Sequence, residues 1–180
     1  VFTGLTRTRE VRKHKLRVIV IDAGHGGKDP GCVAADRHTY EKDVALDIAL
    51  KLGAMISDSL SDIKVIYTRD TDRFIPLWER AEIANKNNAD LFISIHCNAN
   101  RSRDPKGTET YVMGLHKTKG NLEVSKRENR SILMEKDHGG KYDQFDPESE
   151  ESYILLSLMQ NAYRKQSLEL AATIQDRIEK

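Results

Sequence analysis

Two histidines and a glutamate, His25, Glu41 and His96, are the residues of this sequence whose types and positions best suit metal chemistry. His25 lies in a glycine-rich turn directly after an apolar run, and His96 directly follows another apolar run. Glu41 stands at the start of an amphipathic segment that comes after the first run. Two imidazoles and one carboxylate form a known catalytic zinc set, which leaves a fourth position for water or substrate.

The elements predicted around these residues bring them to one place. Residues 16–21 and 91–95 are apolar and rich in β-branched side chains, which is typical of buried strands. If the two strands are parallel, His25 and His96 lie at the same carboxyl-terminal edge of the sheet, where open α/β sheets place their sites. The helix predicted to begin at Glu41 starts near that edge, so all three side chains converge.

Simpler explanations compete with a metal site. A histidine among six is more often a surface or core residue than a ligand. Glu41 also suits the positive end of a helix dipole, while Gly26 and Gly27 suit a tight turn. A phosphate-binding loop is another interpretation of the glycines, but the P-loop spacing is absent and Lys28 is followed by Asp29 rather than by Ser or Thr. Spacing alone leaves these alternatives open.

The remaining pattern predicts one α/β domain over residues 16–180, after a polar and basic tail at 1–15. Further strands are expected at 63–67 and 108–113, and helices at 41–57, 76–88 and 152–180. Each long helix should bury one apolar stripe. The stripe of the first comprises Val44, Ile48, Leu52 and Ile56, with Ala45 and Ala49 beside it. That of the last comprises Leu155, Met159, Ala162, Tyr163, Leu170, Ala171, Ile174 and Ile178.

Composition excludes several classes of protein. The 180 residues are 38% apolar and 32% charged, which is ordinary for a soluble globular domain. A net charge of +1 gives no broad basic field, so no nucleic-acid binding is expected. The sequence shows no signal peptide and no apolar run near the ~20 residues of a transmembrane segment. Cys32 and Cys97 lack CxxC spacing, which favours inert buried thiols.

Four segments stand out in order along the chain: residues 20–31 (VIDAGHGGKDPG), 41–43 (EKD), 68–72 (TRDTD) and 94–99 (SIHCNA). Together they closely resemble the motifs of the zinc-dependent N-acetylmuramoyl-L-alanine amidases, the type 3 amidase family. Residues 107–111 (GTETY) resemble the strand that comes next in that family. The resemblance implies a single α/β domain with a twisted, mixed but mostly parallel β-sheet flanked by helices on both faces.

The same resemblance implies that His25, Glu41 and His96 bind one Zn²⁺ ion per chain. The implied enzyme is a peptidoglycan hydrolase that uses zinc-activated water to cleave the amide bond between N-acetylmuramic acid and L-alanine of the stem peptide. Asn98 would line the substrate groove or cap the loop after the strand. Asp22 is a candidate to orient a ligand histidine, although a role in the turn is favoured.

One functional residue of the family has no counterpart in this sequence. The general base is a glutamate on a strand that follows the last long helix, and no residue here matches its motif. We therefore expect that glutamate beyond Lys180, and slow hydrolysis by residues 1–180 alone. The alternatives are a non-catalytic cell-wall-binding module and a zinc hydrolase of other peptides.

Residues 116–150 are strongly charged and weakly periodic, although 121–136 could be helical. The cell-division amidases of the family carry an insert at this position, whose helix covers the zinc cleft and places a glutamate on the metal. Candidates for that glutamate are Glu123, Glu128 and Glu135, with Glu148, Glu150 and Glu151 as further ones. Leu122, Ile132 and Leu133 would pack against the cleft walls. A solvated charged loop is the competing interpretation.

The resemblance also carries expectations about the setting. It implies an exported protein of the periplasm or cell envelope of a bacterium, active in cell division. Its partners would be peptidoglycan and an activator protein that acts on segment 116–150.

Overall fold

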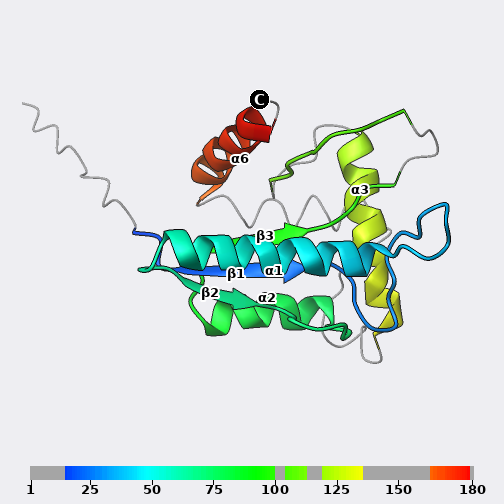
Figure 1. Ribbon diagram of the computed structural model, residues 1–180, viewed down its shortest axis with the longest axis horizontal. Helices are drawn as coiled ribbons and strands as arrows, with labels where there is room; N and C mark the ends of the chain where they lie inside the picture. Colours follow the sequence, from blue (N-terminus) through cyan, green and yellow to red (C-terminus); the bar gives the residue numbers. More distant parts are fainter. Residues whose placement is uncertain (1–14, 100–103, 113–118, 136–162, 179–180) are drawn as a thin grey trace, which may run out of the picture.

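The computed structural model describes residues 15–99, 104–112, 119–135 and 163–178 (Figure 1). In chain order they form β1 (Val18–Ala23), α1 (Glu41–Ser59), β2 (Lys64–Tyr67), α2 (Leu77–Lys86), β3 (Leu91–Ile95), α3 (Lys119–Asn129), the 3₁₀ helix η1 (Arg130–Met134) and α6 (Arg164–Ile178). The strands expected at 16–21, 63–67 and 91–95 and the helices expected at 41–57 and 76–88 are confirmed. The tail expected at 1–15 lies outside the described residues, except for Lys15.

β1 is the central strand of a parallel three-stranded sheet, whose order is β2-β1-β3. Ala23 pairs with Ile95, so β1 and β3 end at the same level. A strand with neighbours on both sides and helices on both faces is expected to be mostly apolar, and Val20 and Ile21 are fully buried. The α/β fold with a parallel sheet is therefore confirmed. In the part of the chain that the structure describes, no strand pair is antiparallel, so the mixed sheet is not seen there.

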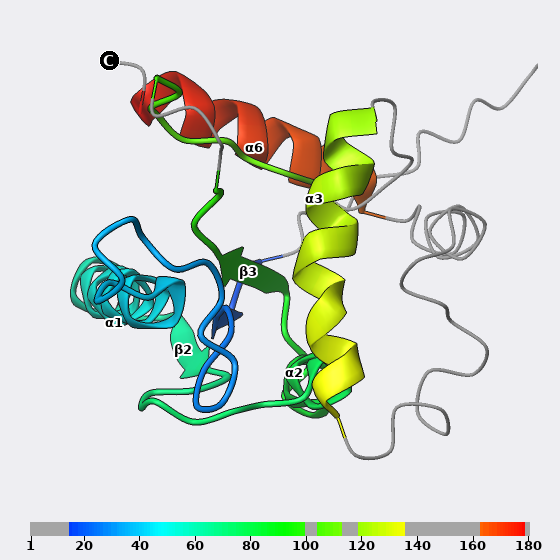
Figure 2. The ribbon, with the colours of Figure 1, turned by 90° about the vertical axis from the view of Figure 1, so that its right-hand side faces the viewer.

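Helices α1 and α2 lie on opposite faces of the sheet (Figure 2). The face of α1 that is buried carries its smallest residues, Ala45, Ala49 and Gly53, against the core around β1. Ile48, expected in the buried stripe, is 43% exposed, so that part of the prediction is wrong. The helix approaches the sheet closely at Gly53, where an added Cβ would lie 1.9 Å from the hydroxyl of Tyr67. Small residues therefore define the buried face.

Helices α3 and η1 cross the carboxyl-terminal end of the strands (Figures 1 and 2). The helix that residues 121–136 could form is thus present, over most of that range. Ile132 is buried, and the Glu135 carboxylate accepts a hydrogen bond of 2.8 Å from the backbone N–H of Leu77 at the start of α2. Leu133 is 59% exposed, so its predicted packing is wrong. Within η1, Ile132 thus faces inward and its neighbour Leu133 faces outward.

The strand expected at 108–113 is not formed over the residues described there, 108–112. Its polar groups bond to α6 instead of to a neighbouring strand. The Thr108 carbonyl accepts a hydrogen bond of 2.9 Å from Nε2 of Gln175, and the Thr110 hydroxyl donates to Oε1 of the same side chain at 3.3 Å.

Helix α6 lies beyond the β3 edge rather than on a face of the sheet (Figure 2). None of its described side chains is buried, and Leu170 and Ile178 are 38% and 52% exposed. Ala171 and Ile174 of the predicted stripe are half-buried, whereas Tyr163, Leu170 and Ile178 are exposed, so the core-facing stripe is only partly seen in the described part of the helix. Residues 152–162, also expected to be helical, lie outside the described part. Among the helices that the structure describes, none is long and apolar enough to span a membrane.

Candidate metal centre

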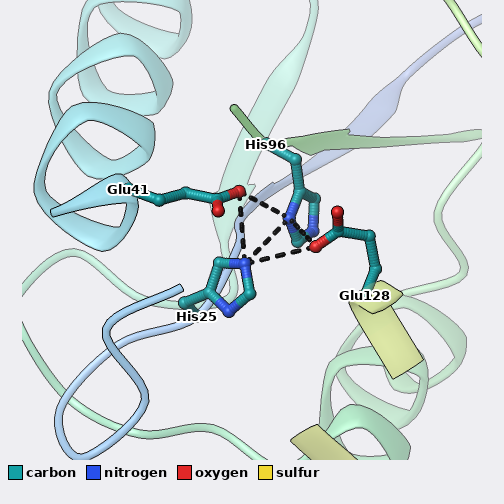
Figure 3. Close-up of side chains that lie close together, drawn as sticks. All are labelled: His25, Glu41, His96 and Glu128. Carbon is teal, nitrogen blue, oxygen red and sulfur yellow. Dashed lines mark hydrogen bonds and ion pairs between the residues drawn. The ribbon is translucent and has the colours of Figure 1, made fainter. Parts of the chain in front are cut away.

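Four side chains from separate elements meet at the carboxyl-terminal end of the sheet: His25, Glu41, His96 and Glu128 (Figure 3). His25 lies in the turn after β1, Glu41 begins α1, His96 follows β3 and Glu128 comes from α3. One donor atom from each lies within 4.8 Å of the other three. The structure thus places the three predicted ligands together, and it adds one of the candidate glutamates of the insert.

The spacing of these donor atoms fits a small tetrahedral cation. Nε2 of His25 lies 3.2 Å from both Nδ1 of His96 and Oε1 of Glu41, and these two atoms are 3.1 Å apart. Oε2 of Glu128 lies 3.3 Å from the His25 nitrogen and 2.9 Å from the His96 nitrogen. Tetrahedral bonds of about 2.0–2.1 Å separate neighbouring ligand atoms by about 3.3 Å. Two nitrogens and two carboxylate oxygens at these spacings form a donor set that suits zinc.

The electrostatics of the site also favour a bound cation. Burial alone lowers the pKa of His25, but hydrogen bonds with Asp29, Glu128 and Glu41 outweigh it and raise the pKa to about 11. For His96, burial is likewise outweighed by Glu128 and Glu41, and its pKa rises to about 9. The two carboxylates thus hold positive charge between them. Protons on the imidazoles or a divalent cation can supply it.

A carboxylate outside the cluster fixes the orientation of one imidazole. Oδ2 of Asp29 lies 2.8 Å from Nδ1 of His25, and both side chains are buried. Because a carboxylate only accepts, Nδ1 carries the proton of the neutral ring and Nε2 presents its lone pair to the cluster. Asp29 therefore orients His25, the role for which Asp22 was a candidate. The favoured alternative for Asp22, a role in the turn, is not confirmed either, because Asp22 lies within β1.

Asp22 instead braces the end of the sheet. Its carboxylate accepts hydrogen bonds of 2.6 Å from the hydroxyls of Thr68, after β2, and Ser94, in β3. It also pairs with the buried guanidinium of Arg80 at 2.7 Å. Burial favours the neutral acid, but Arg80 and the two hydroxyls together hold the pKa of Asp22 below its ordinary value. One charged group therefore joins all three strands directly beneath the site.

Two buried arginines fix the backbone that carries His25. Arg80 donates through Nη2 to the His25 carbonyl at 2.7 Å, and Arg69 donates to the carbonyls of Ala23 and Gly24 at 2.9 and 2.7 Å. His25 has a φ of 59°, a conformation that a non-glycine residue adopts at a cost in energy. The bonds to its carbonyl and to the preceding turn hold it there.

Gly24 leaves space for the second imidazole. A Cβ added at this position would lie 2.4 Å from Cε1 of His96 and 2.7 Å from each ring nitrogen. Any side chain at position 24 would therefore displace the His96 ring from the cluster. The glycine of the turn is required by the geometry of a ligand that lies 72 residues further along the chain.

Glu41 is fixed by two backbone amides as well as by the histidines. The N–H groups of Cys32 and Cys97 each donate to one of its carboxylate oxygens at 2.8 Å. Burial favours the neutral acid, but the bonds from His25, His96 and these amides hold the pKa of Glu41 well below its ordinary value. Both cysteines are free and half-buried. Burial, and then the Glu41 carboxylate, raise the pKa of Cys32 to about 11, so this thiol stays protonated.

The other described candidates, Glu123 and Glu135 of segment 116–150 and Asn98, lie outside the four-residue cluster. Glu123 is exposed, and Glu135 is engaged at the start of α2, so Glu128 alone of the three reaches the cluster. Glu148, Glu150 and Glu151 lie outside the described residues. Asn98 contacts Glu109 and accepts a hydrogen bond from Arg127 on α3.

Asp29, Arg69 and Arg80 were not identified as site residues from the sequence. Arg69 stands just after β2, at the same edge as the histidines, and that position was a usable signal. Arg80 is four residues before Ala84, on the apolar face of its helix, and a charged residue on such a face indicates a buried partner. Asp29 carried no such signal, because its role depends on how the turn folds back.

Comparisons with known proteins identify the family of this chain. The family model described as N-acetylmuramoyl-L-alanine amidase matches residues 19–180. AmiC of Escherichia coli O6:H1 is 46% identical over 103 residues, which cover 57% of this chain and 24% of that protein. AmiA of Escherichia coli K12 is 36% identical over 132 residues, or 71% and 44%. A Buchnera aphidicola relative is 30% identical over 171 residues, or 92% and 69%.

Solved structures show the same architecture. The catalytic domain of CwlV, an N-acetylmuramoyl-L-alanine amidase from Bacillus (Paenibacillus) polymyxa var. colistinus, matches with a TM-score of 0.51 at 35% identity, over 63% of this chain and 62% of that chain. The CwlD amidase of Clostridioides difficile, solved in complex with the GerS lipoprotein, matches at 0.50 and 32% identity, over 67% and 69%. The present chain spans about a quarter of the length of the AmiC relative.

Proposed function

The chain belongs to the N-acetylmuramoyl-L-alanine amidase family, and from that premise we propose that it is a zinc-dependent peptidoglycan amidase. The observation that carries the proposal is the cluster of His25, Glu41 and His96, whose three donor atoms lie 3.1–3.2 Å apart at the edge of the sheet. The bond cleaved is the amide between the lactyl group of N-acetylmuramic acid and L-alanine of the stem peptide. Hydrolysis adds water across it and releases a carboxylate and an amine.

His25, Glu41 and His96 would hold one zinc ion per chain. When bound there, zinc supplies a Lewis acid that makes water nucleophilic near neutral pH and polarises the scissile carbonyl. The protein orients the donors: Asp29 directs Nε2 of His25 inward, and the amides of Cys32 and Cys97 hold the Glu41 carboxylate.

Glu128 would close the fourth position of the metal. Its side chain is mostly buried, at 17% exposure, and it contacts both histidines. Burial favours its neutral form, but the histidines and Arg127 lower the pKa of Glu128 to about 2, so it is ionised at neutral pH. A carboxylate in that position leaves no place for water on a four-coordinate ion. We infer that the docked α3 keeps the enzyme inactive, which suits an activity able to lyse its own cell.

The setting follows from the same premise. Peptidoglycan lies outside the cytoplasmic membrane, so we propose an exported protein of the bacterial periplasm or cell envelope, with a role in cell division. Docking of α3 also calls for a partner that displaces it, and segment 116–150 is the proposed contact of such an activator. The CwlD structure contains a lipoprotein bound to an amidase of the same family, which supports regulation by a second protein.

The proposal is tested by digesting purified peptidoglycan with the zinc-loaded full-length protein and identifying the products by mass spectrometry. We expect stem peptides with a free L-alanine amine and glycan chains that retain intact muramic acid. Glu128→Ala should raise the rate, while Glu123→Ala, on the exposed side of the same helix, should leave it unchanged. Products cut within the peptide or the glycan would disprove the assignment. No product from the Glu128→Ala protein would favour a non-catalytic cell-wall-binding module.

A further inference from the structure

Helix α3 delivers two adjacent side chains to the site, Arg127 and Glu128. Beside Glu128, the guanidinium of Arg127 donates through Nη2 to Oδ1 of Asn98 at 2.8 Å. Its Nη1 lies 3.4 Å from the carbonyl oxygen of Ala99. The same guanidinium bonds Oε1 of Glu128 at 2.9 Å, so the two side chains dock as one unit.

The acceptor that Arg127 meets is oriented by the protein. Nδ2 of Asn98 donates to Oε2 of Glu109 at 2.5 Å and lies 3.5 Å from the Tyr111 hydroxyl. The hydroxyl itself donates to that Glu109 oxygen at 2.8 Å. Because a carboxylate can only accept, the amide nitrogen of Asn98 must face Glu109 and its oxygen must face α3. Oδ1 is therefore held as an acceptor toward α3.

This acceptor is connected to the metal ligands through a short stretch of chain. Asn98 and Ala99 follow His96 by two and three residues, and the intervening Cys97 amide holds the Glu41 carboxylate. An occupant that places an oxygen among the metal ligands can therefore place N–H donors on Asn98 and Ala99. The dipeptide Arg127-Glu128 does both at once.

We propose that Oδ1 of Asn98 and the carbonyl of Ala99 form a subsite for peptide N–H donors of the stem peptide, and that Arg127 fills this subsite while α3 is docked. The inference rests on the proposed function and names the substrate group that this part of the site binds. A peptide offers the matching chemistry, since its backbone carries both a carbonyl oxygen for the metal and N–H donors. Arg127 and Glu128 thus imitate the substrate in both of its polar contacts.

The test compares pairs of ligands on one folded protein. A soluble muramoyl-tripeptide whose scissile amide is replaced by a non-hydrolysable ketomethylene group, and a series of its analogues, each N-methylated at one remaining peptide nitrogen, are titrated by calorimetry into the zinc-loaded full-length Glu128→Ala protein. We expect one analogue to bind about 3- to 10-fold more weakly than the parent, the effect of losing a neutral hydrogen bond. Adding Asn98→Ala should abolish that difference, and adding Tyr111→Phe, which leaves Oδ1 in place, should retain it.

A difference that survives Asn98→Ala overturns the subsite while leaving the amidase assignment intact. If neither ligand binds the Glu128→Ala protein, both proposals fall. An independent arm does not need the Asn98 variant: Arg127→Ala in the otherwise unaltered protein should tighten binding of the unmethylated ligand, whereas the neighbouring Lys126→Ala should not. Equal affinity of the Arg127→Ala and parent proteins contradicts the proposal.

Discussion

Asp29 shows how single residues set the chemistry of this site. It is not one of the four clustered donors, yet its carboxylate at 2.8 Å decides which nitrogen of His25 carries the proton. The amides of Cys32 and Cys97 act in the same way on the two oxygens of Glu41. The orientation of the clustered donor atoms is therefore set by residues outside the cluster.

Replacing this carboxylate by its amide should weaken metal binding without unfolding the protein. We expect Asp29→Asn to lower zinc affinity about 10- to 100-fold, because the amide lacks the charge that makes the His25 imidazole a stronger donor. Competition with a chromogenic chelator measures the affinity. Asp47→Asn is the matched control, since Asp47 is an exposed residue of α1 that pairs with Lys51. Equal affinities of the two variants would show that Asp29 does not tune the ligand.

At the scale of elements, the position of a ligand along its strand was more predictable than the docking of a helix. His25 and His96 follow apolar runs, and parallel strands place such residues at one edge. Glu123 and Glu128 differ by five residues, so they point about 140° apart on a helix. Periodicity cannot say which face docks, and the change to a 3₁₀ helix at Arg130 breaks the register with Glu135. The face of α3 that docks depends on the tertiary contacts of η1 and Glu135, such as the buried side chain of Ile132 and the bond from Leu77 to Glu135.

Those contacts provide a way to loosen α3 without altering the metal ligands. Ile132 is 3% exposed and anchors η1, while its neighbour Leu133 is 59% exposed. Removing a buried isoleucine side chain costs about 2–5 kcal/mol, most of it from the docked state. We therefore expect Ile132→Ala to raise peptidoglycan hydrolysis at least several-fold, measured by release of dye from labelled sacculi. Leu133→Ala should leave the rate near that of the parent, and an unchanged rate for Ile132→Ala would argue against a docked inhibitory helix.

At the scale of the whole molecule, the sheet provides a rigid base and the inserted helix closes the site from above. The carboxyl-terminal ends of the strands are held together by the bonds of Asp22, Arg69 and Arg80. The body of the domain therefore positions three of the four clustered side chains, and α3 positions the fourth. The sequence predicted this base well because periodic apolar patterns report burial in the sheet. It did not predict the exposure of α6, because a stripe of Leu170 and Ile178 says only that a helix has an apolar face, not what covers it.

The most direct test of the proposed zinc site is the zinc content of the purified protein and its variants after dialysis, measured by inductively coupled plasma mass spectrometry. We expect one zinc per chain in the parent and in the exposed-residue control His38→Ala. Glu41→Ala and His96→Ala should lose the metal, because each leaves only two of the three ligands that the body of the domain positions, and the other remaining donor, Glu128, comes from the displaceable helix α3. Glu128→Ala should retain zinc, since three ligands remain. Stoichiometric zinc at unchanged affinity in both Glu41→Ala and His96→Ala would contradict the metal centre on which the account depends.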